Sequence, residues 1–211
     1  MNLFERGLWF ACLLPLSAPV LAANLAVAVQ DGAGKPVADV VVYAESEAGG
    51  APKVAKSAVI EQRGLKFLPL VSVVQTGASI AFPNNDKVRH HIYSFSPAKK
   101  FDQKLYSGVA ASSQVFDKSG TVVLGCNIHD RMVAYVKIVD TPYFAKTEAD
   151  GVARFELPPG KYKLVAWHFN MAAPTGPASE QALTVKAGDA AAAAAFKLAL
   201  KAPVEGEAAG Y

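Results

Sequence analysis

The sequence predicts an all-β fold for the chain after about its first two dozen residues. Short runs of alternating or β-branched apolar residues recur, and turn clusters such as Pro158-Pro159-Gly160 separate them. No window shows a sustained apolar stripe with the period of an amphipathic helix. The length of 211 residues allows one large or two small domains, and the 52% hydrophobic content allows a sizeable packed core.

Residues 1–22 are predicted to be a cleaved export signal. A short polar start precedes an apolar run over residues 8–16, which is too short to span a bilayer, and small residues follow at the cleavage positions. Cys12 would leave with the signal, and we expect a periplasmic mature protein. No later run is long and apolar enough for a membrane span. The net charge of +3 is too mild to indicate a nucleic-acid surface, so neither membrane nor nucleic acid is an expected partner.

The expected strands fall into three groups along the chain. The first group flanks the turn cluster that begins at Asp31-Gly32, and a Gly-, Ala- and Lys-rich loop over residues 45–57 follows it. The alanine run from Ala190 to Ala195 favours helix by propensity alone, but its strand-and-turn neighbourhood makes us expect its end to lead into a final strand. The expected strands cover residues 25–30 and 37–44; then 59–62, 71–75, 79–82, 90–95, 121–124 and 133–139; then 152–157, 162–169, 181–185 and 196–200.

One stretch past the middle, Cys126-Asn-Ile-His129-Asp-Arg-Met132, concentrates metal-binding side chains. Cys126 is the single thiol expected in the mature chain, so it needs a role other than an intramolecular disulfide. His129 and Met132 follow at three-residue intervals, and one loop between two strands can therefore bring all three to one metal. Upstream, His90-His91 offers a second imidazole, and adjacent strand residues point to opposite faces, so both are not expected to serve. A thiolate, two imidazoles and a thioether are the ligand set of a blue-copper electron-transfer site with one copper per chain.

The Cys-x2-His-x2-Met spacing followed by a Val-rich strand resembles the copper loop of amicyanin, a small cupredoxin. The run from Lys66-Phe67 to Asn84-Asn85 is similar to the strand and turn that lead to the first copper histidine in plastocyanin and amicyanin. This resemblance implies a cupredoxin Greek-key β-sandwich over residues 57–140. The wider pattern resembles cupredoxin-like periplasmic proteins that are often labelled methylamine utilisation proteins.

The resemblance also implies the site residues. His90, Cys126 and His129 would form the trigonal copper set, and Met132 would be the weak axial ligand. Two departures accompany the match of His90 to the family's histidine: Arg89 stands where the family usually has proline, and His91 stands where it has asparagine. His91 then has two open roles, either tying the ligand loops together through a ring N–H or competing for the metal.

The remainder of the chain resembles another β-module. The run from Asp150-Gly151 through the Pro-Pro-Gly turn to Tyr162 resembles a carboxypeptidase regulatory-like or transthyretin-like sandwich, and residues 29–42 are similar to the opening of that module. We infer a second, small Ig/transthyretin-like β-sandwich built from residues 24–46 and 141–200, with residues 201–211 as a tail. The alternative is that residues 24–46 decorate the cupredoxin.

The resemblance implies a periplasmic one-electron carrier whose partner is a redox protein such as a c-type cytochrome or a dehydrogenase. His129 would be the electron port, and apolar neighbours such as Ile128 would form the docking face. An enzyme is not expected, because four protein ligands leave no open position on the metal and no nucleophile–base set is present. The alternatives are copper handling without electron transfer, and a structural β-module with a relic site. His168 has no partner at ligand spacing, and we expect it to be a surface histidine.

Overall fold

Strands make up all of the regular secondary structure in the part of the chain that the structure, a computed structural model, describes: residues 22–50, 54–108, 113–171 and 179–201. The all-β prediction is confirmed. Cys12, nearly all of the expected signal and all but the first residue of the expected tail lie outside the described residues. Within the described residues, no helix has the length and apolar character that crossing a membrane requires.

The middle of the chain, residues 58–139, forms a unit in which a five-stranded sheet, ordered β6-β12-β11-β8-β9, packs against a three-stranded sheet, ordered β10-β7-β3. A short pair, β4 with β5, adjoins them. The strands are β3 (Ala58–Val59), β4 (Glu61–Gln62), β5 (Phe67–Leu68), β6 (Val71–Gln75), β7 (Ala78–Ala81), β8 (His90–Ser94), β9 (Phe101–Tyr106), β10 (Gln114–Phe116), β11 (Gly120–Cys126) and β12 (Val133–Val139). We call this unit the first sandwich.

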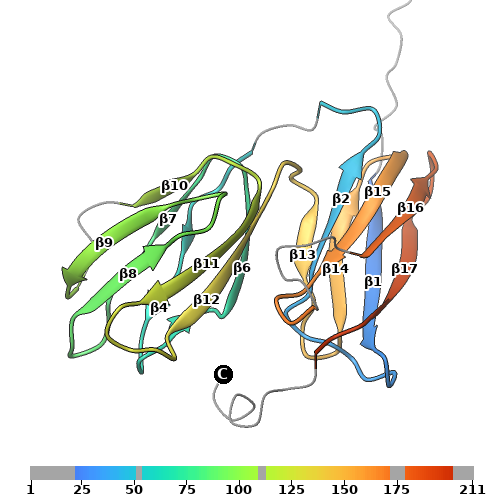
Figure 1. Ribbon diagram of the computed structural model, residues 1–211. Helices are drawn as coiled ribbons and strands as arrows, with labels where there is room; N and C mark the ends of the chain where they lie inside the picture. The colour runs from blue at the N-terminus through green and yellow to red at the C-terminus, as the bar shows by residue number, and fades with distance from the viewer. Residues whose placement is uncertain (1–21, 51–53, 109–112, 172–178, 202–211) are drawn as a thin grey trace, which may run out of the picture.

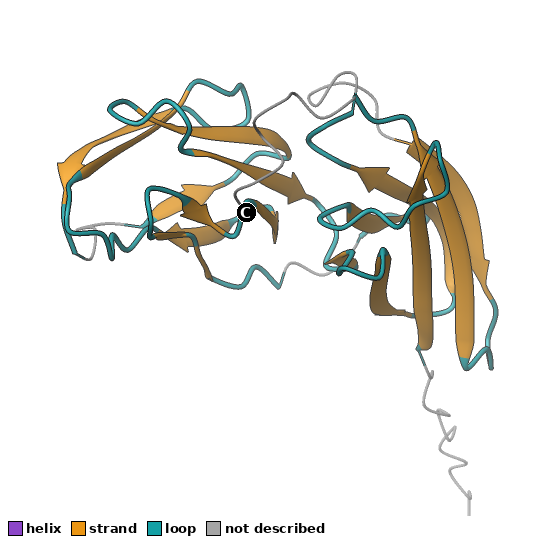
Figure 2. Ribbon diagram, turned by 90° about the horizontal axis from the view of Figure 1, so that it is seen from below, coloured by secondary structure: helices purple, strands orange, loops and turns teal. Residues whose placement is uncertain are grey.

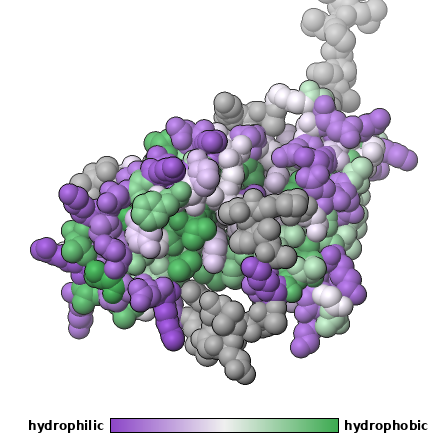
Figure 3. Space-filling model, in the orientation of Figure 1, coloured by the Kyte–Doolittle hydropathy of each residue, from purple (hydrophilic) through white to green (hydrophobic). Residues whose placement is uncertain are grey.

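Alternation along the strands decides which side chains enter the core of the first sandwich. On β11, Val122, Leu124 and Cys126 are buried and belong to one apolar cluster, which also contains Phe82 and Phe116 from the opposing side. The two-residue period of a strand therefore places the thiol on the core face, at the very end of β11. In Figure 3, apolar side chains show over the middle of this unit and hydrophilic ones gather around its rim.

Strands from both ends of the described chain form a second two-sheet unit, which we call the second sandwich (Figure 1). One sheet has the order β14-β1-β17 and the other the order β13-β2-β15-β16. The early strands β1 and β2 thus pair with late ones, and the first sandwich lies between them in sequence. The strands are β1 (Ala23–Asp31), β2 (Val41–Ser46), β13 (Phe144–Lys146), β14 (Val152–Leu157), β15 (Gly160–Trp167), β16 (Ser179–Val185) and β17 (Ala191–Leu198).

The alanine run is part of a strand rather than only a lead into one. Strand β17 starts at Ala191 and pairs in parallel with β1, from Asn24 opposite Ala191 to Asp31 opposite Leu198. Ala192 and Ala194 pack against the core of the second sandwich. Backbone pairing and this packing outweigh the helix propensity of alanine, which is a weak preference per residue.

Figure 2 shows the strands gathered in two units that lie side by side. The two sandwiches pack through an apolar contact between β6 and β12 of the first and β2 and β15 of the second. Val41, Val71 and Trp167 are fully buried there. The rings of Tyr135 and Phe169 stack with their centroids 4.7 Å apart. Side chains on the outer face of β12 therefore hold the second sandwich, while those on its inner face belong to the core of the first.

Candidate metal centre

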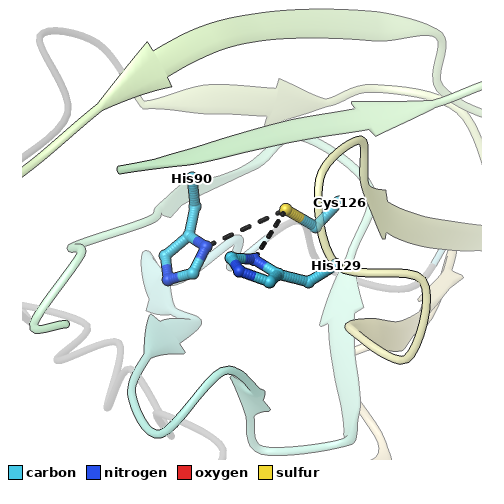
Figure 4. A group of neighbouring side chains, drawn as sticks. All are labelled: His90, Cys126 and His129. Carbon is cyan, nitrogen blue, oxygen red and sulfur yellow. Dashed lines mark hydrogen bonds between the residues drawn. The ribbon is translucent and has the colours of Figure 1, made fainter. Parts of the chain in front are cut away.

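Three side chains converge at one end of the first sandwich. His90 Nδ1 lies 3.9 Å and His129 Nδ1 lies 3.8 Å from Cys126 Sγ. The three ligand atoms all lie within 4.8 Å of one another. Figure 4 shows both imidazole rings directed toward the sulfur, with His90 coming from the start of β8 and Cys126 from the end of β11.

Backbone pairing brings these residues together. Strands β8 and β11 are antiparallel neighbours, with Cys126 opposite Ile92. The loop after Cys126 folds back on itself, because Cys126 N–H donates to Met132 O at 3.2 Å and Met132 N–H donates to His129 O at 2.9 Å. Three of the expected ligands therefore sit on a short turn that β11 and β12 hold at both ends.

The structure separates His90 from His91. His90 is fully buried, whereas His91 lies on the opposite face of β8, where its Nε2 contacts the carboxylate of Asp102 on β9. Asn127 N–H does donate to the backbone carbonyl of His91 at 3.4 Å, so the tie between the ligand segments runs through the main chain and not through the imidazole ring. The His91 ring therefore neither ties the ligand loops together nor points toward the ligand cluster.

Met132 is buried, with 1% of its surface exposed, and lies in the same apolar cluster as Cys126. Cys126 is 4% exposed, while the His129 ring is only half-buried. The structure thus places all four predicted ligands at one end of the first sandwich. His129 is the one that reaches toward solvent.

Asp86 contacts the ring nitrogen of His90 that faces away from Cys126. Asp86 was not among the site residues predicted from the sequence. Its carboxylate lies 2.8 Å from His90 Nε2 and accepts the backbone N–H groups of Gly64 and Leu65 at 2.6 Å and 3.0 Å. Gly64 and Leu65 both have positive φ, 64° and 58°, and two consecutive amides in this conformation form a cradle for an anion. Burial opposes ionisation of Asp86, but the hydrogen bonds from His90, Leu65 and Gly64 lower its pKa overall.

The pairing with Asp86 fixes the orientation of the His90 ring. A carboxylate only accepts hydrogen bonds, so Nε2 is the nitrogen that donates to Asp86, and Nδ1 is the nitrogen that faces Cys126. An imidazole whose second nitrogen donates to a carboxylate is the usual arrangement of a metal-ligating histidine. The four-residue spacing of Asp86 and His90 was the available signal in the sequence.

A thiol and two imidazoles at these separations fit a transition-metal ion. A His₂Cys set with a methionine thioether nearby has the composition of a type 1 copper site. The separations between the donor atoms leave room for one ion among them. The residues present therefore fit the copper centre that the sequence predicts.

Asp86→Asn is expected to weaken Cu(II) binding by about 10–100-fold, because loss of an outer partner of a ligating histidine has effects of this size. Removing the carboxylate also makes His90 a poorer donor, so the reduction potential should rise. Competition titrations against a chelator measure the first effect and spectroelectrochemistry the second. Asp102→Asn, which disturbs His91 on the other face of the same strand, is the matched control. Equal affinities for the two variants would contradict the role of Asp86.

His168 is not a surface residue, so that expectation is wrong. It follows β15, is 7% exposed and packs against the ring of Phe169 with the centroids 4.3 Å apart. Its Nδ1 accepts the N–H of Asn170 at 3.2 Å. Desolvation by burial lowers its pKa to about 4, and Asp39 opposes that shift. His168 lies outside the ligand cluster.

The buried His168 is expected to make the protein less stable in mild acid. Its pKa is about 4 in the fold and near 6.5 in the unfolded chain, so between these values the unfolded chain binds more protons. The free energy of unfolding should therefore fall as the pH drops from about 6.5 to about 4, by on the order of 2 kcal/mol from this residue. Urea unfolding at several pH values would measure it. His168→Gln should lose that part of the pH dependence, and identical profiles would refute the assignment.

No protein-family model matches the chain, and no curated protein matches it. Solved structures do match part of the chain, including the following three. A purple cupredoxin from Nitrosopumilus maritimus is 20% identical, over 39% of this chain and 98% of its own, with a TM-score of 0.34. Amicyanin from Paracoccus versutus is 16% identical, over 48% and 99%, with a TM-score of 0.36.

The third is the Cu-containing nitrite reductase from Thermus scotoductus, which is 18% identical over 52% of this chain, with a TM-score of 0.37. The match covers only 28% of the reductase. Likenesses of this strength do not assign the chain to a family, and the function must be argued from the side chains that the first sandwich brings together.

Proposed function

We propose that the protein is a type 1 copper protein that carries single electrons. The observation that carries the proposal is the convergence of His90 Nδ1 and His129 Nδ1 on Cys126 Sγ, at 3.9 Å and 3.8 Å. Copper, when bound, would supply the one-electron couple. Cys126 would bind it as the thiolate together with His90 and His129, and Met132 would be a weak fourth donor that tunes the potential.

The way the residues are held suits electron transfer. His90 is fixed by Asp86, Cys126 by its strand, and His129 and Met132 by the backbone bonds of one tight loop. A site that barely rearranges between oxidation states exchanges electrons with little structural cost. Four protein donors leave no obvious place for a substrate, which favours a carrier over an enzyme.

The half-buried His129 supports a route for the electron. His90, Cys126 and Met132 are enclosed, so the His129 ring is the ligand through which a partner at the surface comes nearest to the metal. Ile128, 49% exposed, lies directly beside it. We propose a periplasmic location, in line with the export signal expected over residues 1–22, and a redox protein such as a c-type cytochrome or a dehydrogenase as partner.

Titrating the mature protein with Cu(II), while recording visible and EPR spectra, tests the proposal. The expected result is an intense thiolate-to-copper band with a narrow copper hyperfine splitting, saturating at one copper per chain, followed by reversible reduction and reoxidation. If the protein stayed colourless and bound only Cu(I), the result would favour copper handling over electron transfer. If the protein bound no copper, the remaining alternative would be a structural β-module with a relic site.

A further inference from the structure

Exposed apolar side chains surround the ligand cluster. Leu65 is 47%, Val88 46% and Ile128 49% exposed, and each lies on a different loop. Asp86 accepts the amide N–H of Leu65, which joins two of the loops, and Asn127 N–H of the third donates to the carbonyl of His91 on β8, directly after the second loop. The loops over residues 63–66, 83–89 and 127–132 thus form one surface, which we call the ligand end of the first sandwich.

Positive charge dominates the ligand end. Its loops carry five cationic residues against two acidic ones, Asp86 and Asp130, and the carboxylate of Asp86 is already engaged by His90 and two backbone amides. Lys87, Arg89 and Arg131 are exposed, and none of them forms an ion pair with any residue that the structure describes. The five cations are Arg63, Lys66, Lys87, Arg89 and Arg131.

We propose that the ligand end docks a redox partner whose surface is acidic around an apolar centre. The inference rests on the proposed electron-carrier function and adds the chemistry of the partner. Apolar contacts at Leu65, Val88 and Ile128 would exclude water and close the distance to His129. The unpaired cations would steer an acidic surface into that position, because complementary charge raises the association rate more than it raises the final affinity.

A rival surface lies at the other end of the first sandwich. Lys99, Lys100 and Lys118 lie on the turns that follow β8 and precede β11, which are the ends of these strands remote from His90 and Cys126. Phe95, 79% exposed, is also there. The ligand end differs from this surface because it contains His129, and an experiment that compares the two ends tests the assignment.

Two triple variants make that comparison at equal net charge. The first is Lys87→Gln, Arg89→Gln, Arg131→Gln; the control is Lys99→Gln, Lys100→Gln, Lys118→Gln. Stopped-flow oxidation of the Cu(I) protein uses ferricyanide as the anionic probe and tris(phenanthroline)cobalt(III) as the cationic one. At low ionic strength, the first variant should react about tenfold more slowly with ferricyanide and faster with the cobalt complex. The control should react with both probes much as the parent protein does.

A copper-independent readout accompanies the kinetics. Hexacyanochromate(III), a paramagnetic anion, should broaden the amide NMR signals of the ligand end in the metal-free protein, and the first triple variant should lose this broadening. Broadening centred on Lys99, Lys100 and Lys118 would overturn the inference. Equal salt dependence of the two oxidation reactions would also overturn the inference, but it would not contradict the electron-carrier function. Anion binding at the ligand end without redox cycling by either reagent would instead refute the electron-carrier function.

Discussion

Cys126→Ser is expected to abolish the intense visible absorption of the Cu(II)-loaded protein. The band arises from charge transfer between a thiolate and copper, and Cys126 is the single cysteine among the described residues. Serine is nearly isosteric but does not ionise at neutral pH, so the site would keep two imidazoles and lose its anionic donor. Visible and EPR spectra after Cu(II) titration give the readout. The copper hyperfine splitting should widen to that of an ordinary Cu(II) site, and the reduction potential should change.

The controls separate loss of the ligand from loss of the fold. Cys126 is 4% exposed in the apolar core, so circular dichroism and urea unfolding should be recorded for the Ser variant. His91→Asn changes the neighbouring histidine that faces away from the cluster, and it should retain the colour. A Cys126→Ser protein with unchanged colour and potential would refute the copper assignment of this thiol.

The clustering of the four predicted ligands could be anticipated because most of the information is local. Cys126, His129 and Met132 lie on one loop, and strand alternation alone requires His90 and His91 to face opposite ways. The sequence left open which of those two faces the thiol. Burial of His90 and the contact of His91 with Asp102 answer that question, and both depend on how β8 sits between β9 and β11.

Features that depend on distant contacts were not predictable in the same way. The amides of Gly64 and Leu65 that bind Asp86 come from a left-handed backbone more than 20 residues away, and nothing in a non-glycine residue such as Leu65 signals that conformation. His168 is buried beside Phe169, whose ring stacks on Tyr135 of the first sandwich, so its burial depends on packing between segments far apart in sequence. The alanines of β17 became a strand for the same reason.

The two faces of β12 connect the site to the rest of the molecule. Ala134 and Val136 face the core that contains Cys126, while Tyr135 faces the second sandwich and stacks on Phe169. Strand β12, which follows the loop that carries His129 and Met132, is thus packed on both faces. We infer that the second sandwich makes this strand more rigid without contacting the predicted ligands.

Trp167→Ala is expected to lower the free energy of unfolding by about 3–5 kcal/mol, the usual cost of truncating a fully buried tryptophan. The indole is 0% exposed and packs with Val41 and Val71 where the two sandwiches meet, and the Lys137 ammonium lies 5.3 Å from the ring centroid. Truncating the Trp167 side chain opens a cavity between the sandwiches rather than inside the core of either one. Each core keeps its own apolar cluster, so the two units should then unfold in separate transitions.

Urea unfolding followed by two probes would measure this uncoupling. The copper band reports on the first sandwich, and far-ultraviolet circular dichroism reports on both. Coincident curves in the parent protein and separated curves in Trp167→Ala are expected, with the spectrum of the folded copper site unchanged, because Trp167 lies outside the ligand cluster. Phe95→Ala, which removes an aromatic side chain that is 79% exposed, should leave the stability nearly unaltered. If Trp167→Ala cost no more than Phe95→Ala, the contact would not couple the sandwiches, and the rigidity of β12 would have to come from the core of the first sandwich alone.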